Sequence, residues 1–82
     1  MALDYAERGI RVNAVAPGPI GTKRLSALPE EQRSPIARAV PLRRVGRPEE
    51  VAAAVVWLCS EQASYITGTT LTIDGGKLAA GA

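Results

Sequence analysis

Hydrophobic and polar positions alternate early in the chain. The alternating run reads Ile10, Arg11, Val12, Asn13, Ala14, Val15. A period of two with β-branched residues is typical of a β-strand, and Gly9 just before it suits the residue that follows a helix C-terminus. We therefore predict a helix over residues 2–8 and a strand over residues 10–15.

The predicted strand leads into a proline- and glycine-rich turn. Pro17 has no N–H for a sheet ladder, and Gly18 can adopt positive φ. Pro19 disfavours a helical conformation at Gly18, so we expect the chain to leave the sheet here. Ligands of open parallel α/β sheets bind beyond the carboxyl ends of the strands, where this turn would lie.

A second helix and a second strand are predicted later in the chain. Pro48 suits the first helical position, and the run from Val51 to Cys59 is apolar on nearly every face, so we predict a helix over residues 48–60 that is covered on two sides. Polar and apolar residues alternate over residues 69–73, which predicts a strand. It ends at Asp74, Gly75 and Gly76, a turn in which the carboxylate is expected to bond its own backbone.

Three ordered motifs resemble one family. They are residues 2–18 (ALDYAERGIRVNAVAPG), residues 46–52 (GRPEEVA) with residues 65–68 (YITG), and residues 73–76 (IDGG). Together they resemble the closing third of the short-chain dehydrogenases/reductases. The resemblance implies an α/β fold, namely the C-terminal part of a doubly wound, parallel-sheet Rossmann-type domain. Residues 1–82 would form a partial domain with the order helix, strand, helical lid, helix, strand.

The resemblance also implies a hydride transfer between NAD or NADP and a small-molecule alcohol or carbonyl substrate. The family's catalytic tyrosine and lysine lie four residues apart, but Tyr5 is followed at that distance by Gly9 and Tyr65 by Thr69. The family's catalytic serine and glycine-rich phosphate loop are not matched either. We therefore assign no catalytic residue, and we expect a piece of a longer protein or a truncated gene product that is inactive alone.

Four cofactor-binding residues follow from the same resemblance: Pro17, Gly18, Ile20 and Thr22. The backbone at Ile20 and the hydroxyl of Thr22 would contact the nicotinamide carboxamide, which offers one acceptor and two donor hydrogens. Alternatively, Thr22 caps a following helix, a role compatible with ligand contact, and Pro17 and Gly18 form a plain strand-ending turn. Asn13 is interpreted as a structural side chain that bonds a neighbouring loop.

Residues 23–47 differ in character from their flanks. They are rich in cations and broken by Pro29, Pro35 and Pro41, which predicts short helical turns joined by kinks. By position they resemble the family's substrate lid. Their charge either favours an anionic substrate or is a solvated helix face. Residues 77–82 are expected to be a flexible tail.

Composition narrows the remaining possibilities. The net charge is +2, and one tryptophan, two tyrosines and no phenylalanine make a nucleic-acid surface a poor interpretation. The absence of histidine gives no support to a metal site, and no apolar run is long enough for a membrane span. Cys59 is the single cysteine, which fits a cytoplasmic setting.

Two classes of function remain. In the first, the chain belongs to an oxidoreductase and forms homo-oligomers through the helix over residues 48–60 and the strand over residues 69–73, as the resemblance implies. In the second, the same elements make it a non-enzymatic interaction module. Trp57 is either an interface anchor or an ordinary core residue.

Overall fold

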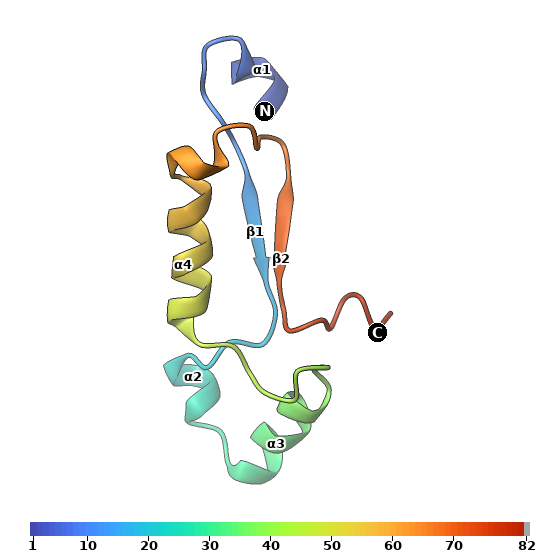
Figure 1. Cartoon of the computed structure of the whole chain (residues 1–82). Coiled ribbons are helices and arrows are strands. Elements are labelled where there is room, and N and C mark those ends of the chain that lie inside the picture. Colours follow the sequence, from blue (N-terminus) through green and yellow to red (C-terminus); the bar gives the residue numbers. More distant parts are fainter. Residues whose placement is uncertain (82) are drawn as a thin grey trace.

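The computed structural model describes residues 1–81. In chain order its elements are α1 (Ala2–Ala6), β1 (Ala14–Pro17), α2 (Lys23–Ser26), α3 (Glu30–Arg38), α4 (Pro48–Leu58), the short 3₁₀-helix η1 (Glu61–Ala63) and β2 (Thr70–Ile73). The two strands lie side by side, α4 runs along one side of them, and α2 and α3 lie beyond one end of the pair (Figure 1).

The two strands form a parallel pair in which Ala14 faces Thr70 and Pro17 faces Ile73. The helices between them give the strand–helix–strand order expected of an α/β fold. The N–H groups of Ala14 and Gly18 donate to Thr69 O (3.0 Å) and Ile73 O (2.9 Å). In such a ladder the N–H groups of alternate residues point to the same neighbouring strand, so the nitrogen of Pro17 points away from β2. The missing N–H of Pro17 therefore costs no hydrogen bond between β1 and β2.

The first strand begins later than predicted. It covers residues 14–17 rather than 10–15, because residues 10–13 bond a loop instead of a strand. Val12 O accepts from the Gly68 N–H (2.8 Å), and the Val12 N–H donates to the Thr67 hydroxyl (3.0 Å). The second strand starts at Thr70, one residue after its predicted start.

Asn13 has the structural role expected of it. Its Nδ2 donates to Ile66 O (3.0 Å), and its Oδ1 accepts from the Thr69 N–H (3.1 Å). The Asn13 side chain therefore joins the segment before β1 to the segment before β2. Arg11 joins the same segment to the end of α4, because its guanidinium donates to Leu58 O (2.8 Å) and Ser60 O (3.3 Å).

The first helix is shorter than predicted and ends at Ala6 rather than Arg8. Gly9 follows at φ +76°, as its helix-ending role requires. The Gly9 and Ile10 N–H groups donate to Ala6 O (3.0 Å) and Tyr5 O (3.3 Å), which satisfies the last helical carbonyls.

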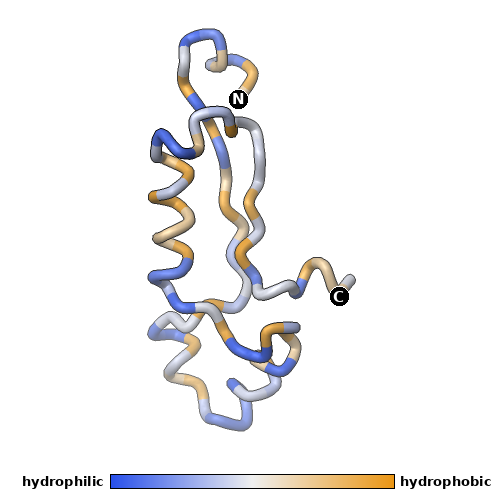
Figure 2. The backbone as a smooth tube through the Cα atoms, in the orientation of Figure 1, coloured by the Kyte–Doolittle hydropathy of each residue, from blue (hydrophilic) through white to orange (hydrophobic). Residues whose placement is uncertain are grey.

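Helix α4 begins at Pro48 as predicted and ends at Leu58, two residues early. Leu58 is buried, and Val51 and Ala54 are half-buried. Ala52, Ala53 and Val56 on the opposite face are exposed, although Figure 2 shows α4 as a mainly hydrophobic stretch with hydrophilic ends. The second apolar face therefore has no partner in the part of the chain that the structure describes.

The apolar core is small. Among residues 1–81 the buried side chains are those of Val40, Leu58 and Ala63. None of the residues in α2 or α3 is buried. Residues 77–81 form hydrogen-bonded turns, and residue 82 of the predicted tail lies outside the described residues.

Candidate functional site

The four predicted cofactor residues border one shallow surface groove that is open to solvent. Pro17, Gly18, Ile20 and Thr22 line a space of about 510 Å³ together with Pro48 and Val51 from the start of α4. This groove lies at the carboxyl end of β1, as expected for a ligand site of a parallel sheet. The structure thus brings the four residues together in space as well as in sequence.

Gly18 is held against the turn that follows β2. A Cβ atom at this position would lie 2.6 Å from Asp74 Cβ and 2.9 Å from Asp74 Cα, so no side chain fits. Its φ is not among the positive values in the chain. The sequence analysis expected a glycine here because it can adopt positive φ, and that reason is wrong. Glycine is required at position 18 because its backbone lies so close to that of Asp74.

The peptide groups around Ile20 are fixed by the residues at the other end of the lid. The Gly21 N–H donates to Gly46 O (2.8 Å), and the Gly46 N–H donates to Pro19 O (2.9 Å). In this parallel bridge the N–H and C=O of Ile20 itself point away from Gly46. Ile20 O accepts from the Thr22 N–H (2.7 Å), and among residues 1–81 no acceptor bonds the Ile20 N–H.

Thr22 caps α2, as one of the two interpretations expected. Its Oγ1 accepts from the Leu25 N–H at 3.3 Å. A hydroxyl has one proton to donate and a second lone pair, so the cap leaves the Thr22 O–H able to donate to a ligand. Ile20, whose N–H has no acceptor among residues 1–81, and Thr22, whose hydroxyl can still donate, both line the same groove.

Asp74 forms the predicted turn. Its Oδ1 accepts from the Gly76 N–H (2.9 Å) and its Oδ2 from the Leu78 N–H (2.8 Å). Both carboxylate oxygens are therefore occupied by the local backbone, which confirms the interpretation of Asp74 as a turn residue.

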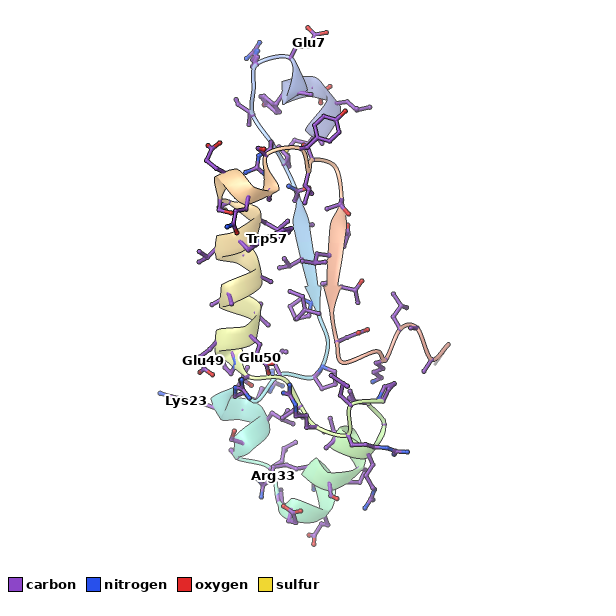
Figure 3. The ribbon with its side chains drawn as sticks, viewed as in Figure 1. Glu7, Lys23, Arg33, Glu49, Glu50 and Trp57 are labelled. Carbon is purple, nitrogen blue, oxygen red and sulfur yellow. The ribbon has the colours of Figure 1, made fainter. Side chains whose placement is uncertain are left out.

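An ion pair at the end of the lid was not predicted from the sequence. The Arg44 guanidinium donates to both carboxylate oxygens of Glu50, at 2.7 and 3.0 Å, and the Arg47 N–H donates to Oε1 at 2.9 Å. These bonds from Arg44 and then from Arg47 lower the pKa of Glu50 from 4.5 to about 2 and raise that of Arg44. Figure 3 shows Glu50 at the start of α4, where the lid ends.

One half of this arrangement had a sequence signal. A carboxylate three residues after a helix N-cap commonly accepts from the N-cap N–H, and the spacing from Arg47 to Glu50 fits that pattern. Arg44 lies six residues from Glu50 across the turn into α4, a spacing that no local rule covers.

The other lid cations are mostly exposed, and none of them lines the groove beside Ile20. Arg33 pairs with Glu30 at 3.1 Å, and Arg43 donates to Arg38 O at 2.7 Å. These contacts support the interpretation of the lid charge as a solvated surface. Trp57, near the end of α4 (Figure 3), keeps 42% of its surface exposed, a value between those of a core residue and a free side chain.

Two further observations concern the described part of the chain. Within residues 1–81 no helix has the length and apolar character needed to cross a bilayer. Nor do three or more His, Cys, Asp or Glu side chains gather there in a group that could hold a metal ion.

Comparison with known proteins identifies the family. A family model described as enoyl-(acyl carrier protein) reductase matches residues 1–77. The chain is 53% identical over 77 residues to glucose 1-dehydrogenase 2 of Bacillus subtilis and 54% identical over 80 residues to 3beta-hydroxysteroid dehydrogenase 1 of Eggerthella lenta, covering 93% of this chain and 30% of each relative. The 3-oxoacyl-(acyl-carrier-protein) reductase of Thermotoga maritima is 49% identical over 75 residues, which is 92% of this chain and 30% of that protein.

The chain thus spans about 30% of the length of these relatives. Their names all denote dehydrogenases or reductases, and another relative is described as a short-chain type dehydrogenase/reductase, at 52% identity over 79 residues. The matched residues 1–77 include all three motifs, and the chain belongs to the short-chain dehydrogenase/reductase family.

Proposed function

We propose that this chain supplies the nicotinamide-side loop, the substrate lid and a subunit contact of an NAD(P)-dependent oxidoreductase with a doubly wound Rossmann-type domain. The reaction is hydride transfer between the cofactor and a small-molecule alcohol or carbonyl compound. The observation that carries the proposal is the meeting of Pro17, Gly18, Ile20 and Thr22 along one groove at the carboxyl end of β1.

The donors around this groove fit a carboxamide. The Ile20 N–H has no acceptor among residues 1–81 and the Thr22 O–H retains its donor capacity, so both can bond the carboxamide oxygen, while a second lone pair on Ile20 O can accept from its NH₂ group. The nicotinamide ring supplies the hydride chemistry when it is bound. The role of the loop 17–22 is to orient the nicotinamide ring and to hold one face of the ring toward the substrate.

We infer that the acid–base groups come from outside these residues. No tyrosine in the chain is followed by a lysine four residues later, and histidine is absent. Contacts to a carboxamide do not replace a phosphate-binding loop, so the isolated chain binds the cofactor weakly and does not turn over substrate.

The proposed lid, residues 23–47, is supported by the way its base is closed. Two hydrogen bonds join Gly21, Gly46 and Pro19 at this base, and α2 and α3 beyond it have no buried residues. Apart from the contact of residues 40–42 with the turn after β2, such a segment is held at its base, as a closing loop requires.

The proposed subunit contact is supported by the outer face of α4. Ala52, Ala53 and Val56 are exposed there, with Val56 at 69%. Small and aliphatic side chains on one helix face suit close packing against a second copy of the same face. Within residues 1–81, β2 also has an unpaired edge, on the side away from β1, which could pair with a second copy.

The single cysteine supports a cytoplasmic setting, where disulfide bonds are rare. Localisation of a tagged chain by cell fractionation tests this part of the proposal. Recovery from an oxidising compartment would contradict it.

A calorimetric titration of the chain with NADH and with NADPH tests the cofactor part directly. We expect weak binding, with a dissociation constant of the order of millimolar, because only the nicotinamide end is contacted. Nuclear magnetic resonance of the labelled chain should then show shifts at Ile20 and Thr22. Shifts confined to residues outside the loop 17–22 would contradict the proposed site.

The non-enzymatic interaction module is the less favoured alternative. Its support is the same exposed face of α4, whereas the matched family is named for reductase activity. A chain that self-associates but shows no shift at the loop with either cofactor would favour the module.

A further inference from the structure

The turn at residues 74–76 touches two segments that are distant in sequence. The loop 17–22 lies on one side of it, and the end of the lid, residues 40–42, lies on the other. Val40 is 2% exposed and is the largest fully buried side chain among residues 1–81. Val40 is the one buried residue of the lid, whose other residues are half-buried or exposed, and this indicates a fixed contact.

The lid and the turn meet in direct contact at Val40. A Cβ atom at Gly75 would lie 2.5 Å from Val40 Cγ1, and the Leu42 N–H donates to Gly75 O at 3.2 Å. Gly75 has φ +64°, so the turn also depends on glycine for its conformation. Val40 therefore rests directly on the backbone of the turn.

The opposite side of the turn is equally close to the loop. Gly18 approaches Asp74 so closely that a Cβ atom would lie 2.6 Å from Asp74 Cβ, and the Gly18 N–H donates to Ile73 O. The two carboxylate bonds of Asp74 keep the turn in one conformation between these contacts. Val40, Gly75, Asp74 and Gly18 thus form one continuous packed row.

We propose that Val40 is a positioning residue for the loop 17–22: by resting on Gly75 it fixes the Asp74–Gly76 turn against Gly18. The role of that loop in binding nicotinamide rests on the proposed function. Groups in direct van der Waals contact transmit displacement to one another, because close-packed protein interiors have low compressibility. A shift of residues 40–42 during lid movement therefore moves the loop as well.

Amide hydrogen exchange of the labelled 82-residue chain tests the proposal in Val40→Ala. The Gly18 N–H, at the turn end of β1, should exchange about tenfold faster than in the wild type, because its support is loosened. The Ala14 N–H lies at the far end of the same strand and should keep its rate. Equal acceleration at both ends, or no change at Gly18, would overturn the proposal.

Leu58→Ala is the matched control. Leu58 is also buried, at 7% exposed, but lies on α4 away from the turn. Its truncation should not accelerate Gly18 selectively over Ala14. Selective acceleration of Gly18 in this variant would show that any core loss has the same effect, and would overturn the role given to Val40.

A second variant decides the matter if Val40→Ala does not fold. Val40→Ile adds one carbon to a buried side chain that already lies against Gly75, so the turn should shift. Changes in the amide shifts of Gly18 and Gly75, with none at Ala14, would support the proposal. Changes confined to residues 39–43 would overturn it. These measurements need no cofactor, so failure to bind NADH would refute the proposed function alone.

Discussion

Gly18 and Gly21 lie three residues apart in one loop but have different amounts of space. A Cβ atom at Gly21 would make ordinary contacts, at 3.5 Å to Gly46 O and to Val45 Cγ2, whereas one at Gly18 would overlap Asp74. We expect Gly18→Ala to lower the free energy of unfolding by about 1–3 kcal/mol, and Gly21→Ala to leave it unchanged or raise it by up to about 1 kcal/mol. Urea unfolding followed by circular dichroism measures both, and equal losses would contradict the close approach seen at Gly18.

Thr22 allows the cap and the ligand contact to be separated. An aspartate at this position still accepts from the Leu25 N–H, but it has no proton to donate and adds a negative charge. Thr22→Asp should therefore keep the stability of the wild type and weaken NADH binding by about tenfold or more, the equivalent of one hydrogen bond. Thr22→Ser keeps both functions and is the control. Unchanged NADH affinity in Thr22→Asp would leave Thr22 with the capping role alone.

At the scale of the element, the start of α4 carries the clearest pH dependence. The pKa of Glu50 is about 2 in the folded chain, below its ordinary value of 4.5, so between these values the unfolded chain binds a proton that the folded chain does not. This contribution to stability is fully present above pH 4.5 and is lost as the pH falls toward 2. Thermal unfolding from about pH 6 to about pH 2 measures it.

Two variants isolate the Glu50 contribution. Glu50→Gln cannot ionise, so its melting temperature should depend less on pH than that of the wild type over the same range. Glu49→Gln, at the neighbouring exposed position, should follow the wild type, because Glu49 lies 3.8 Å from Arg47 and makes no contact with Arg44. Identical pH profiles for Glu50→Gln and the wild type would show that the ion pair does not persist in solution.

Elements defined by local chemistry were predictable from the sequence. Pro48 at the first position of α4, Gly9 after α1, the Thr22 cap and the Asp74 turn each depend on residues within four positions, and the structure confirms each of them. The start of β1 was predicted wrongly because a strand is defined by its partner. Residues 10–13 have strand-like alternation but face a loop, and the bonds of Asn13 that reveal this join residues more than 50 positions apart.

The same reasoning explains what was missed at the site. The proximity of Pro17, Gly18, Ile20 and Thr22 followed from one short loop, so sequence order was enough to predict it. The Arg44–Glu50 pair and the contact of Val40 with Gly75 depend on how the lid returns across the end of the sheet. Nothing in the pattern of residues 23–47 distinguishes Val40 from its exposed neighbours.

At the scale of the whole molecule, the chain is long and thin, with extents of 50 × 26 × 20 Å and few buried residues. A domain of this size buries a modest share of its surface, so an exposed apolar helix face adds to the tendency to associate. Val56 is at the centre of that face of α4 and is 69% exposed. We therefore expect the chain to self-associate through α4, and a charge at Val56 to prevent it.

Sedimentation velocity of Val56→Lys measures this prediction. A lysine buried against a second copy loses its hydration and gains no charged partner, so the association constant should fall about 100-fold or more. The helix content of the chain should be unchanged, because residue 56 is exposed in the monomer. Leu3→Lys adds the same charge at a position of α1 that is 90% exposed, and it should sediment as the wild type does. A wild-type chain that stays monomeric at high concentration would refute the α4 contact. An equal effect of the two lysine substitutions would show that net charge, rather than this face of α4, controls association.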